Sequence, residues 1–206
     1  MTRIVPLLGI DRLTALARAE PVELDLASFL FLRHGETDGN LRSIYQRPDQ
    51  PLNATGEAQA ARAATLLARQ RVVDVVASPM ARAWRTATVA AEPHGLAPRP
   101  EPGIQERVYT ALFGQPNSDF DWALDPPGCE SLEAFVARVR TGLARALGAP
   151  PPATGQRLVV AHGGVLLVLA AMVGVDLPPE LHRNATPLMF ERQAGAWAAR
   201  GIAATT

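Results

Sequence analysis

Short apolar segments alternate with helical patterns along this chain, and no other feature of the sequence constrains its fold as strongly. Residues 28–32, 72–77 and 158–161 are almost wholly apolar and have the length of buried strands. A segment with helical spacing or a helix start signal separates each from the next. This alternation predicts an α/β fold with a mostly parallel central sheet.

The remaining segments predict four helices and a terminal hairpin. Ser78 is expected to cap a helix whose first residue is Pro79, and Gly174 is expected to stop the last helix. A hairpin should turn at Ala194 and Gly195. The expected helices cover residues 56–69, 78–92, 131–147 and 164–173, and the hairpin covers residues 188–200.

The chain of 206 residues, of which 48% are hydrophobic, fits one domain with a substantial core. We expect this domain at residues 27–206, with an irregular, cap-like segment at residues 107–128. Residues 1–26 form an extension. Apolar residues at positions 10, 13, 16 and 17 predict that it contains a short accessory helix packed on the body, with a lid or dimer arm as the alternative.

Charge and composition exclude several functional classes. Basic and acidic residues number 20 each, so the net charge of zero gives no general attraction to nucleic acid or to an anionic membrane. The single cysteine, Cys129, excludes an internal disulfide. The longest apolar run is about half of a bilayer span, and residues 4–10 match an export signal only weakly. We expect a cytoplasmic protein without nucleic acid or membrane partners.

Histidine and arginine residues follow the expected strands at the edge where an α/β sheet binds ligands. Arg33 and His34 follow the first strand, Arg82 lies just after the second, and His162 and Gly163 follow the third. Guanidinium groups suit a phosphoryl group, and the amides of Gly163 and Gly164 open a helix, an end that attracts anions. The sequence therefore predicts a phosphate site.

These residues argue against a metal or another cofactor. A catalytic zinc site needs about three protein ligands, whereas this edge offers two histidines flanked by two arginines that repel a cation. Nor does the sequence contain an Asp cluster suited to magnesium. A neutral imidazole can form a covalent intermediate, so one histidine is interpreted as the nucleophile and the other as a group that binds the phosphoryl.

A leaving alcohol needs a proton, and Glu106 is the strongest candidate for the acid because it opens the irregular segment. Glu36, Asp38 and Asp119 are its rivals, although Glu36 lies so near His34 that orienting the site fits it better. Of the side chains nearby, Arg85 either extends the basic pocket or is exposed. His94 and His182 are interpreted as surface residues, Asn184 as structural, and Trp122 as packing with access to substrate.

Several motifs in sequence order resemble the histidine phosphatase, or phosphoglycerate mutase-like, superfamily. The resemblance covers about residues 28–200. Residues 31–37 resemble its signature, with Asn40 at the expected offset, and residues 78–87 resemble its second arginine motif. The segments Ile104-Gln105-Glu106-Arg107 and Ala161-His162-Gly163-Gly164 resemble its acid motif and its second histidine motif.

The resemblance implies a three-layer α/β/α sandwich and a role for each matching residue. His34 would be the phosphorylated nucleophile and Glu106 the acid and base. Arg33, Arg82 and His162 would complete the phosphate pocket, and Asn40 would contact the phosphate or the substrate. Residues 1–26 have no counterpart in the family pattern, residues 107–128 match poorly, and Cys129 interrupts the usual approach to Glu130 and Ser131.

The favoured function is a metal-independent phosphatase of a small phosphorylated metabolite. The alternatives are a phosphoglycerate mutase-type enzyme, a protein phosphohistidine or phosphotyrosine phosphatase, and a non-catalytic phosphate-binding module. Phosphate release separates the phosphatase from the mutase, which would interconvert isomers. The sequence does not give the physiological substrate, and a homodimer is left open.

Overall fold

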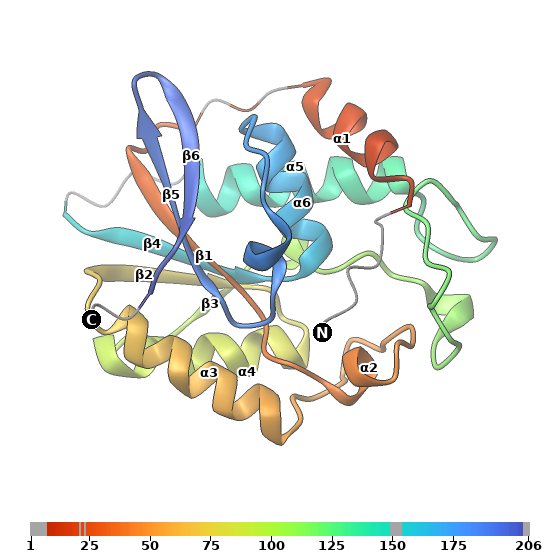
Figure 1. Cartoon of the computed structure of the whole chain (residues 1–206), viewed down its shortest axis with the longest axis horizontal. Coiled ribbons are helices and arrows are strands. Elements are labelled where there is room, and N and C mark those ends of the chain that lie inside the picture. The colour runs from red at the N-terminus through yellow and green to blue at the C-terminus, as the bar shows by residue number, and fades with distance from the viewer. Residues whose placement is uncertain (1–7, 21, 23, 149–153, 204–206) are drawn as a thin grey trace.

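The computed structural model describes residues 8–20, 22, 24–148 and 154–203, and a six-stranded sheet forms its centre (Figure 1). The strand order is β3-β2-β4-β1-β5-β6, in which the first four strands are parallel and β5 pairs antiparallel with both β1 and β6. The strands are β1 Ser28–Arg33, β2 Val72–Ala77, β3 Arg99–Pro100, β4 Gln156–Ala161, β5 Pro187–Gln193 and β6 Ala196–Gly201.

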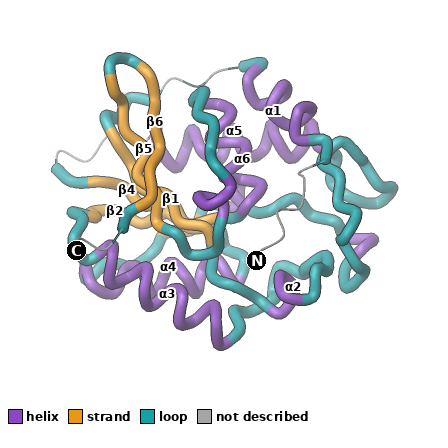
Figure 2. Tube along the Cα trace, viewed as in Figure 1, coloured by secondary structure: helices purple, strands orange, loops and turns teal. Residues whose placement is uncertain are grey.

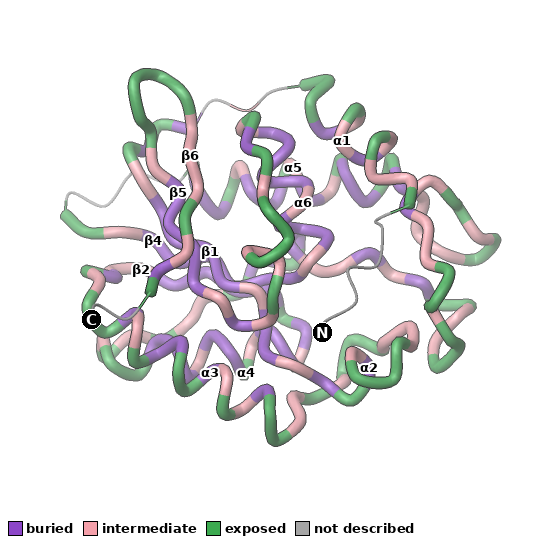
Figure 3. Tube along the Cα trace, in the orientation of Figure 1, coloured by how far each residue is buried: buried purple, intermediate pink, exposed green. Residues whose placement is uncertain are grey.

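Helices cover both faces of the sheet and make the predicted three layers. Alternate residues of β1 point to opposite faces. Phe29 and Phe31 pack in a core with the helices α5 and α6, whereas Leu30 and Leu32 pack in a second core with α3 and α4. Buried residues lie in the inner strands and on the helices that pack against them (Figure 3). The helices are α3 Ala54–Leu67, α4 Ala81–Ala91, α5 Leu132–Gly148 and α6 Gly163–Met172.

Most predicted elements are confirmed within two residues, including the hairpin that turns at Ala194 and Gly195. The predicted start of α4 is wrong. Its N-cap is Met80 rather than Ser78, and Pro79 precedes the helix. The Ser78 hydroxyl instead accepts a hydrogen bond from the Met80 amide and lies against His162. The capping signal therefore gave the wrong helix start, because the Ser78 hydroxyl contacts the buried ring of His162 instead of capping the helix.

One short strand and one short α-helix were not predicted. One is the two-residue edge strand β3, which is too short to show a period. The other is α2, Asp38–Leu41, a single turn with a capping box formed by Thr37 and Asn40. This box fixes the chain just after His34.

The N-terminal extension contains the predicted helix, α1 Ile10–Arg18, which packs on α5 and α6. Its Leu13 and Ala17 side chains are fully buried in the larger core. Residues 107–128 contain turns, one short 3-10 helix and two isolated β-bridges, at Pro116 and Asp121, and with α2 these loops gather at one end of the sheet (Figure 2). Over the ranges that the structure describes, no helix is both long and apolar enough to span a bilayer.

Candidate active site

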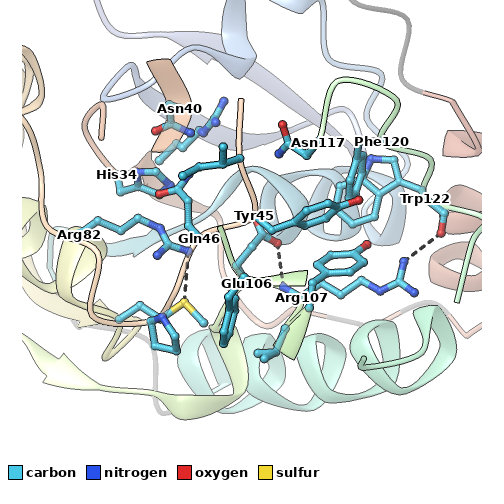
Figure 4. Close-up of a pocket in the computed structure, with 17 residues that line it drawn as sticks. His34, Asn40, Tyr45, Gln46, Arg82, Glu106, Arg107, Asn117, Phe120 and Trp122 are labelled. Atoms are coloured by element: carbon cyan, nitrogen blue, oxygen red, sulfur yellow. Dashed lines mark hydrogen bonds between the residues drawn. The ribbon is translucent and has the colours of Figure 1, made fainter. Parts of the chain in front are cut away.

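A cavity of about 190 Å³ opens beyond the carboxyl ends of the parallel strands, where the loops gather (Figure 4). Five of the predicted site residues line it. They come from the end of β1, from α2, from the start of α4 and from the segment after β3: Arg33, His34, Asn40, Arg82 and Glu106. His34 and Arg82 lie at one side of the cavity, and Phe120 and Trp122 lie at the other.

His34 continues the line of β1, because its amide donates to the Ala161 carbonyl of β4. Its Nδ1 lies 2.7 Å from the Gly35 carbonyl oxygen. A carbonyl only accepts, so this contact requires the proton on Nδ1 and leaves the lone pair on Nε2. Burial, reinforced by the charges of Arg82 and Arg33, holds the His34 pKa well below its ordinary value. The ring is therefore a neutral imidazole with an available nitrogen.

His162 lies next to His34, with 5.2 Å between the ring centroids. It is fully buried, and neither it nor Gly163 is among the residues that line the cavity. Its Nε2 lies 2.8 Å from Ser78 Oγ, whereas its Nδ1 has no hydrogen-bond partner within the described ranges. Burial, followed by the charge of Arg82, holds the His162 pKa well below its ordinary value.

The two arginines are held by backbone carbonyls rather than by carboxylates. Arg33 donates to the His182 carbonyl at 2.6 Å, and Arg82 donates to the Arg47 carbonyl at 3.1 Å. Each retains a buried Nε–H without a partner among the described residues. Burial lowers the pKa of Arg82 to about 10, so the group remains cationic at neutral pH. Two guanidinium groups with unused donors suit a phosphoryl group.

Glu106 is positioned by backbone amides at the cavity wall. One carboxylate oxygen accepts from the Arg107 amide at 3.1 Å and the other from the Gly164 amide at 3.0 Å. Arg138 steadies the same segment, since it donates to the Glu106 carbonyl and forms a bidentate pair with Glu130. The carboxyl group therefore has a fixed place beside the start of α6.

The rival carboxylates lie outside the cavity lining. Glu36 accepts a hydrogen bond from Asn53, whereas Asp38 and Asp119 are exposed. Arg85 is also exposed and pairs with Glu57 at 3.0 Å, so it does not extend the basic pocket. Asn184 is structural as predicted, because its side-chain amide donates to the His34 carbonyl.

Sequence reasoning missed several residues around the site. Ser78, which contacts His162, was interpreted only as a helix cap. His182 was interpreted as a surface residue, but it is half-buried, its carbonyl holds Arg33, and burial lowers its pKa. Trp122 is buried and lines the cavity, as expected for a packing residue with access to substrate. The other unpredicted cavity residues come from segments without periodicity and include Tyr45, Tyr109, Phe113, Asn117 and Phe120.

Among the residues with described positions, no group of three or more His, Cys, Asp or Glu side chains is arranged to hold a metal ion. Three arginines line the cavity: Arg33, Arg82 and Arg107, of which Arg107 is paired with Asp125.

Comparison with known proteins identifies the family of this chain. A family model described as the histidine phosphatase superfamily (branch 1) matches residues 29–202. The chain belongs to the histidine phosphatase superfamily. The match begins after α1, so this helix lies outside the part that the family model covers.

Phosphatases are among the relatives in this family. The chain is 34% identical over 161 residues to the uncharacterized phosphatase PhoE of Bacillus subtilis, covering 76% of this chain and 81% of PhoE. It is 30% identical to glucosyl-3-phosphoglycerate phosphatase of Mycobacterium tuberculosis, covering 69% and 73%. It is also 32% identical to agropine synthesis reductase of Rhizobium rhizogenes over 84% of its own length, but spans only 41% of that longer protein.

Solved structures show the same fold. A structure named mycobacterial hydrolase 1 has a TM-score of 0.70 and 26% identity, covering 84% of this chain and 96% of that one. Mycobacterial glucosyl-3-phosphoglycerate phosphatase, solved in complex with VO3, has a TM-score of 0.67 and 25% identity, covering 85% and 97%.

Proposed function

We propose that this protein is a phosphomonoester hydrolase that acts on a small phosphorylated metabolite through a phosphohistidine at His34. The observation that carries the proposal is a neutral imidazole whose Nε2 lone pair is unused, next to two buried guanidinium groups. Phosphatases among the relatives, including one solved with VO3, support the same reaction class.

The reaction has two steps, phosphorylation of His34 and hydrolysis of the phosphohistidine. His34 Nε2 attacks phosphorus, the bond from phosphorus to the alcohol oxygen breaks, and Glu106 donates the proton that the leaving oxygen needs. A water molecule then attacks the phosphohistidine while Glu106 takes its proton. The nitrogen–phosphorus bond breaks, so His34 is regenerated and inorganic phosphate is released.

Arg33 and Arg82 supply the positive charge in this proposal. Preorganised hydrogen-bond donors stabilise the charge that develops on the transferring phosphoryl group. This stabilisation of the transition state is largest in a site from which water is excluded. His162 Nδ1 would add a further donor at the same group. We accordingly propose that turnover needs no metal ion.

The proposal is tested by phosphate release from 4-nitrophenyl phosphate and from a panel of phosphorylated metabolites. His34→Asn should lower the rate about a thousandfold or more. The matched control, His94→Asn, replaces a histidine outside the cavity and should retain the rate of the parent enzyme. Quenching during turnover should leave one acid-labile phosphoryl group on the peptide that contains His34.

Four results would each overturn a part of the proposal. A phosphoryl group on another residue, or full activity of His34→Asn, removes His34 as the nucleophile. Loss of activity in EDTA that an added divalent ion restores removes metal independence. Conversion of one phosphoglycerate isomer to another without phosphate release identifies a mutase instead.

A further inference from the structure

We propose that the alcohol part of the substrate is an uncharged group built on a single ring with at least one hydrogen-bonding oxygen, and that phosphorylated acids are poor substrates. This inference rests on the proposed phosphatase activity and names the substrate class of the same site. It follows from the half of the cavity that lies away from His34 and Arg82.

Aromatic side chains form the wall of this distal half. Tyr45 and Tyr109 lie 4.8 Å apart between ring centroids, and Phe120 lies 5.6 Å from Tyr109 and 4.8 Å from Trp122. Phe113 lines the cavity as well. Aromatic rings present flat apolar faces on which a ring of the substrate can pack. A volume of about 190 Å³ in all is small for a binding pocket, so one ring is the size that fits beside the phosphoryl group.

Two polar atoms in this wall have no partner within the described part of the chain. They are the hydroxyl of Tyr109 and the indole N–H of Trp122, whose side chains line the cavity and are each only 6% exposed. Buried polar groups almost always have a hydrogen-bond partner. Burial raises the pKa of Tyr109, so its hydroxyl stays neutral. An oxygen atom on the bound alcohol would pair with one or both.

The distal half offers no unused positive charge to a second anionic group. Arg107 is the only cation there among the described cavity residues. Its three nitrogens donate to the carbonyls of Glu130, Trp122 and Leu124 and to the carboxylate of Asp125, and its side chain is fully buried.

The uncharged polar side chains that line the cavity are the amides of Asn40, Gln46 and Asn117, of which Asn117 lies toward Phe120 in the distal half (Figure 4). An exposed arginine, Arg47, stacks on the ring of Phe113 but does not line the cavity. A carboxylate or a second phosphate would therefore be desolvated without an ion-pair partner, which is costly.

The first test compares two isosteric substrates, 4-carbamoylphenyl phosphate and 4-carboxyphenyl phosphate. They differ in the charge of one group at the far end of the ring. We expect kcat/KM to be at least about tenfold higher for the neutral amide. Equal values, or a preference for the carboxylate, would overturn the proposal. If Arg47→Gln removed a preference for the carboxylate, recognition of a second anion would be assigned to that arginine.

The second test removes each unpartnered polar atom and compares two substrates, so that a change in packing alone affects both. Tyr109→Phe and Trp122→Phe should lower kcat/KM more for 4-carbamoylphenyl phosphate than for phenyl phosphate, by a ratio of threefold or more. Trp197→Phe changes a tryptophan on β6, outside the cavity, and should leave this ratio at its parent value. An unchanged ratio in both cavity variants would overturn the hydrogen-bonding part.

Phenyl phosphate separates the failure of this inference from the failure of the proposed function. Release of phosphate from phenyl phosphate that depends on His34 supports the phosphatase whatever the ring substituent does. If no aryl or alkyl phosphate is hydrolysed, the proposed function fails and this inference fails with it. If hydrolysis is seen but the carboxylate is preferred, only the substrate class is wrong.

Discussion

Ser78 and His162 form the one direct side-chain link between the end of β2 and the end of β4 at the site, within the described chain. Ser78 Oγ already accepts from the Met80 amide, so its own proton is available to His162 Nε2. This arrangement favours the tautomer in which His162 Nδ1 carries the other proton and can donate to a bound phosphoryl oxygen. Ser78 is therefore a positioning residue.

Ser78→Ala should lower kcat about tenfold and weaken binding of vanadate, because His162 loses the partner that fixes its ring and tautomer. Steady-state kinetics and a vanadate inhibition constant measure the two effects. The matched control is Ser28→Ala, at the end of β1 opposite to the site, which should change neither kcat nor the vanadate inhibition constant. Parent values of both constants in Ser78→Ala would show that His162 needs no such support.

Glu106 is the residue whose proposed role depends most on the leaving group. Glu106→Gln should slow the hydrolysis of an alkyl phosphate at least about a hundredfold. The loss on 4-nitrophenyl phosphate should be several times smaller, because that leaving oxygen needs little protonation. Rates on the two substrates give the comparison. Equal losses on both would remove Glu106 from the acid role.

At the scale of elements, α1 holds the segment that carries Phe120 and Trp122. The Trp122 amide donates to the Leu8 carbonyl at 2.9 Å. Arg12 of α1 donates to the Ala123 carbonyl and to the carboxylates of Asp125 and Glu133. A helix outside the family match is thus tied to the distal wall of the cavity.

Arg12→Gln should loosen that wall and raise KM for a ring-bearing substrate about threefold to tenfold, with a smaller effect on kcat. Michaelis constants for phenyl phosphate measure the change. The control is Arg18→Gln, which removes an exposed ion pair to Asp176 at the other end of α1. If both variants have the KM of the parent enzyme, α1 does not position the cavity wall.

The same segments show what could be predicted from the sequence. β1, β2 and β4 were predictable because buried strands are apolar on both faces, and His34 was predictable because it follows such a strand. The cavity wall was not. Residues 43–45 reach residues 114–117 through three backbone hydrogen bonds, which join Tyr45 to Gln115, Gly114 to Tyr45 and Asn117 to Ser43. Contacts between distant irregular segments leave no period in a sequence.

For the molecule as a whole, the site places two imidazoles and two guanidinium groups together at the end of a buried sheet. Such a cluster opposes folding unless an anion binds there. Vanadate or phosphate should therefore raise the melting temperature, since a ligand that binds only the folded state stabilises it. The same cluster makes stability depend on pH.

The two buried histidines should destabilise the fold as the pH falls below about 6.5, the ordinary pKa of histidine. In the unfolded chain both imidazoles take up protons in this range, whereas in the folded protein burial and the nearby arginines depress both pKa values. The unfolded state then binds more protons, so the free energy of unfolding decreases by up to about 1.4 kcal/mol per pH unit for each histidine.

Melting temperatures between pH 7.5 and pH 5.5 test this dependence. The carboxylates whose pKa values are lowered by arginine partners or backbone amides, such as Asp74 and Glu101, lose their contribution only at lower pH. The double variant His34→Asn/His162→Asn should therefore have a flatter profile than the parent. His94→Asn, which removes a less buried histidine, should keep most of the slope. A parent profile that is already flat in this range would mean that the two rings are protonated within the fold, and His34 could not then act as a neutral nucleophile.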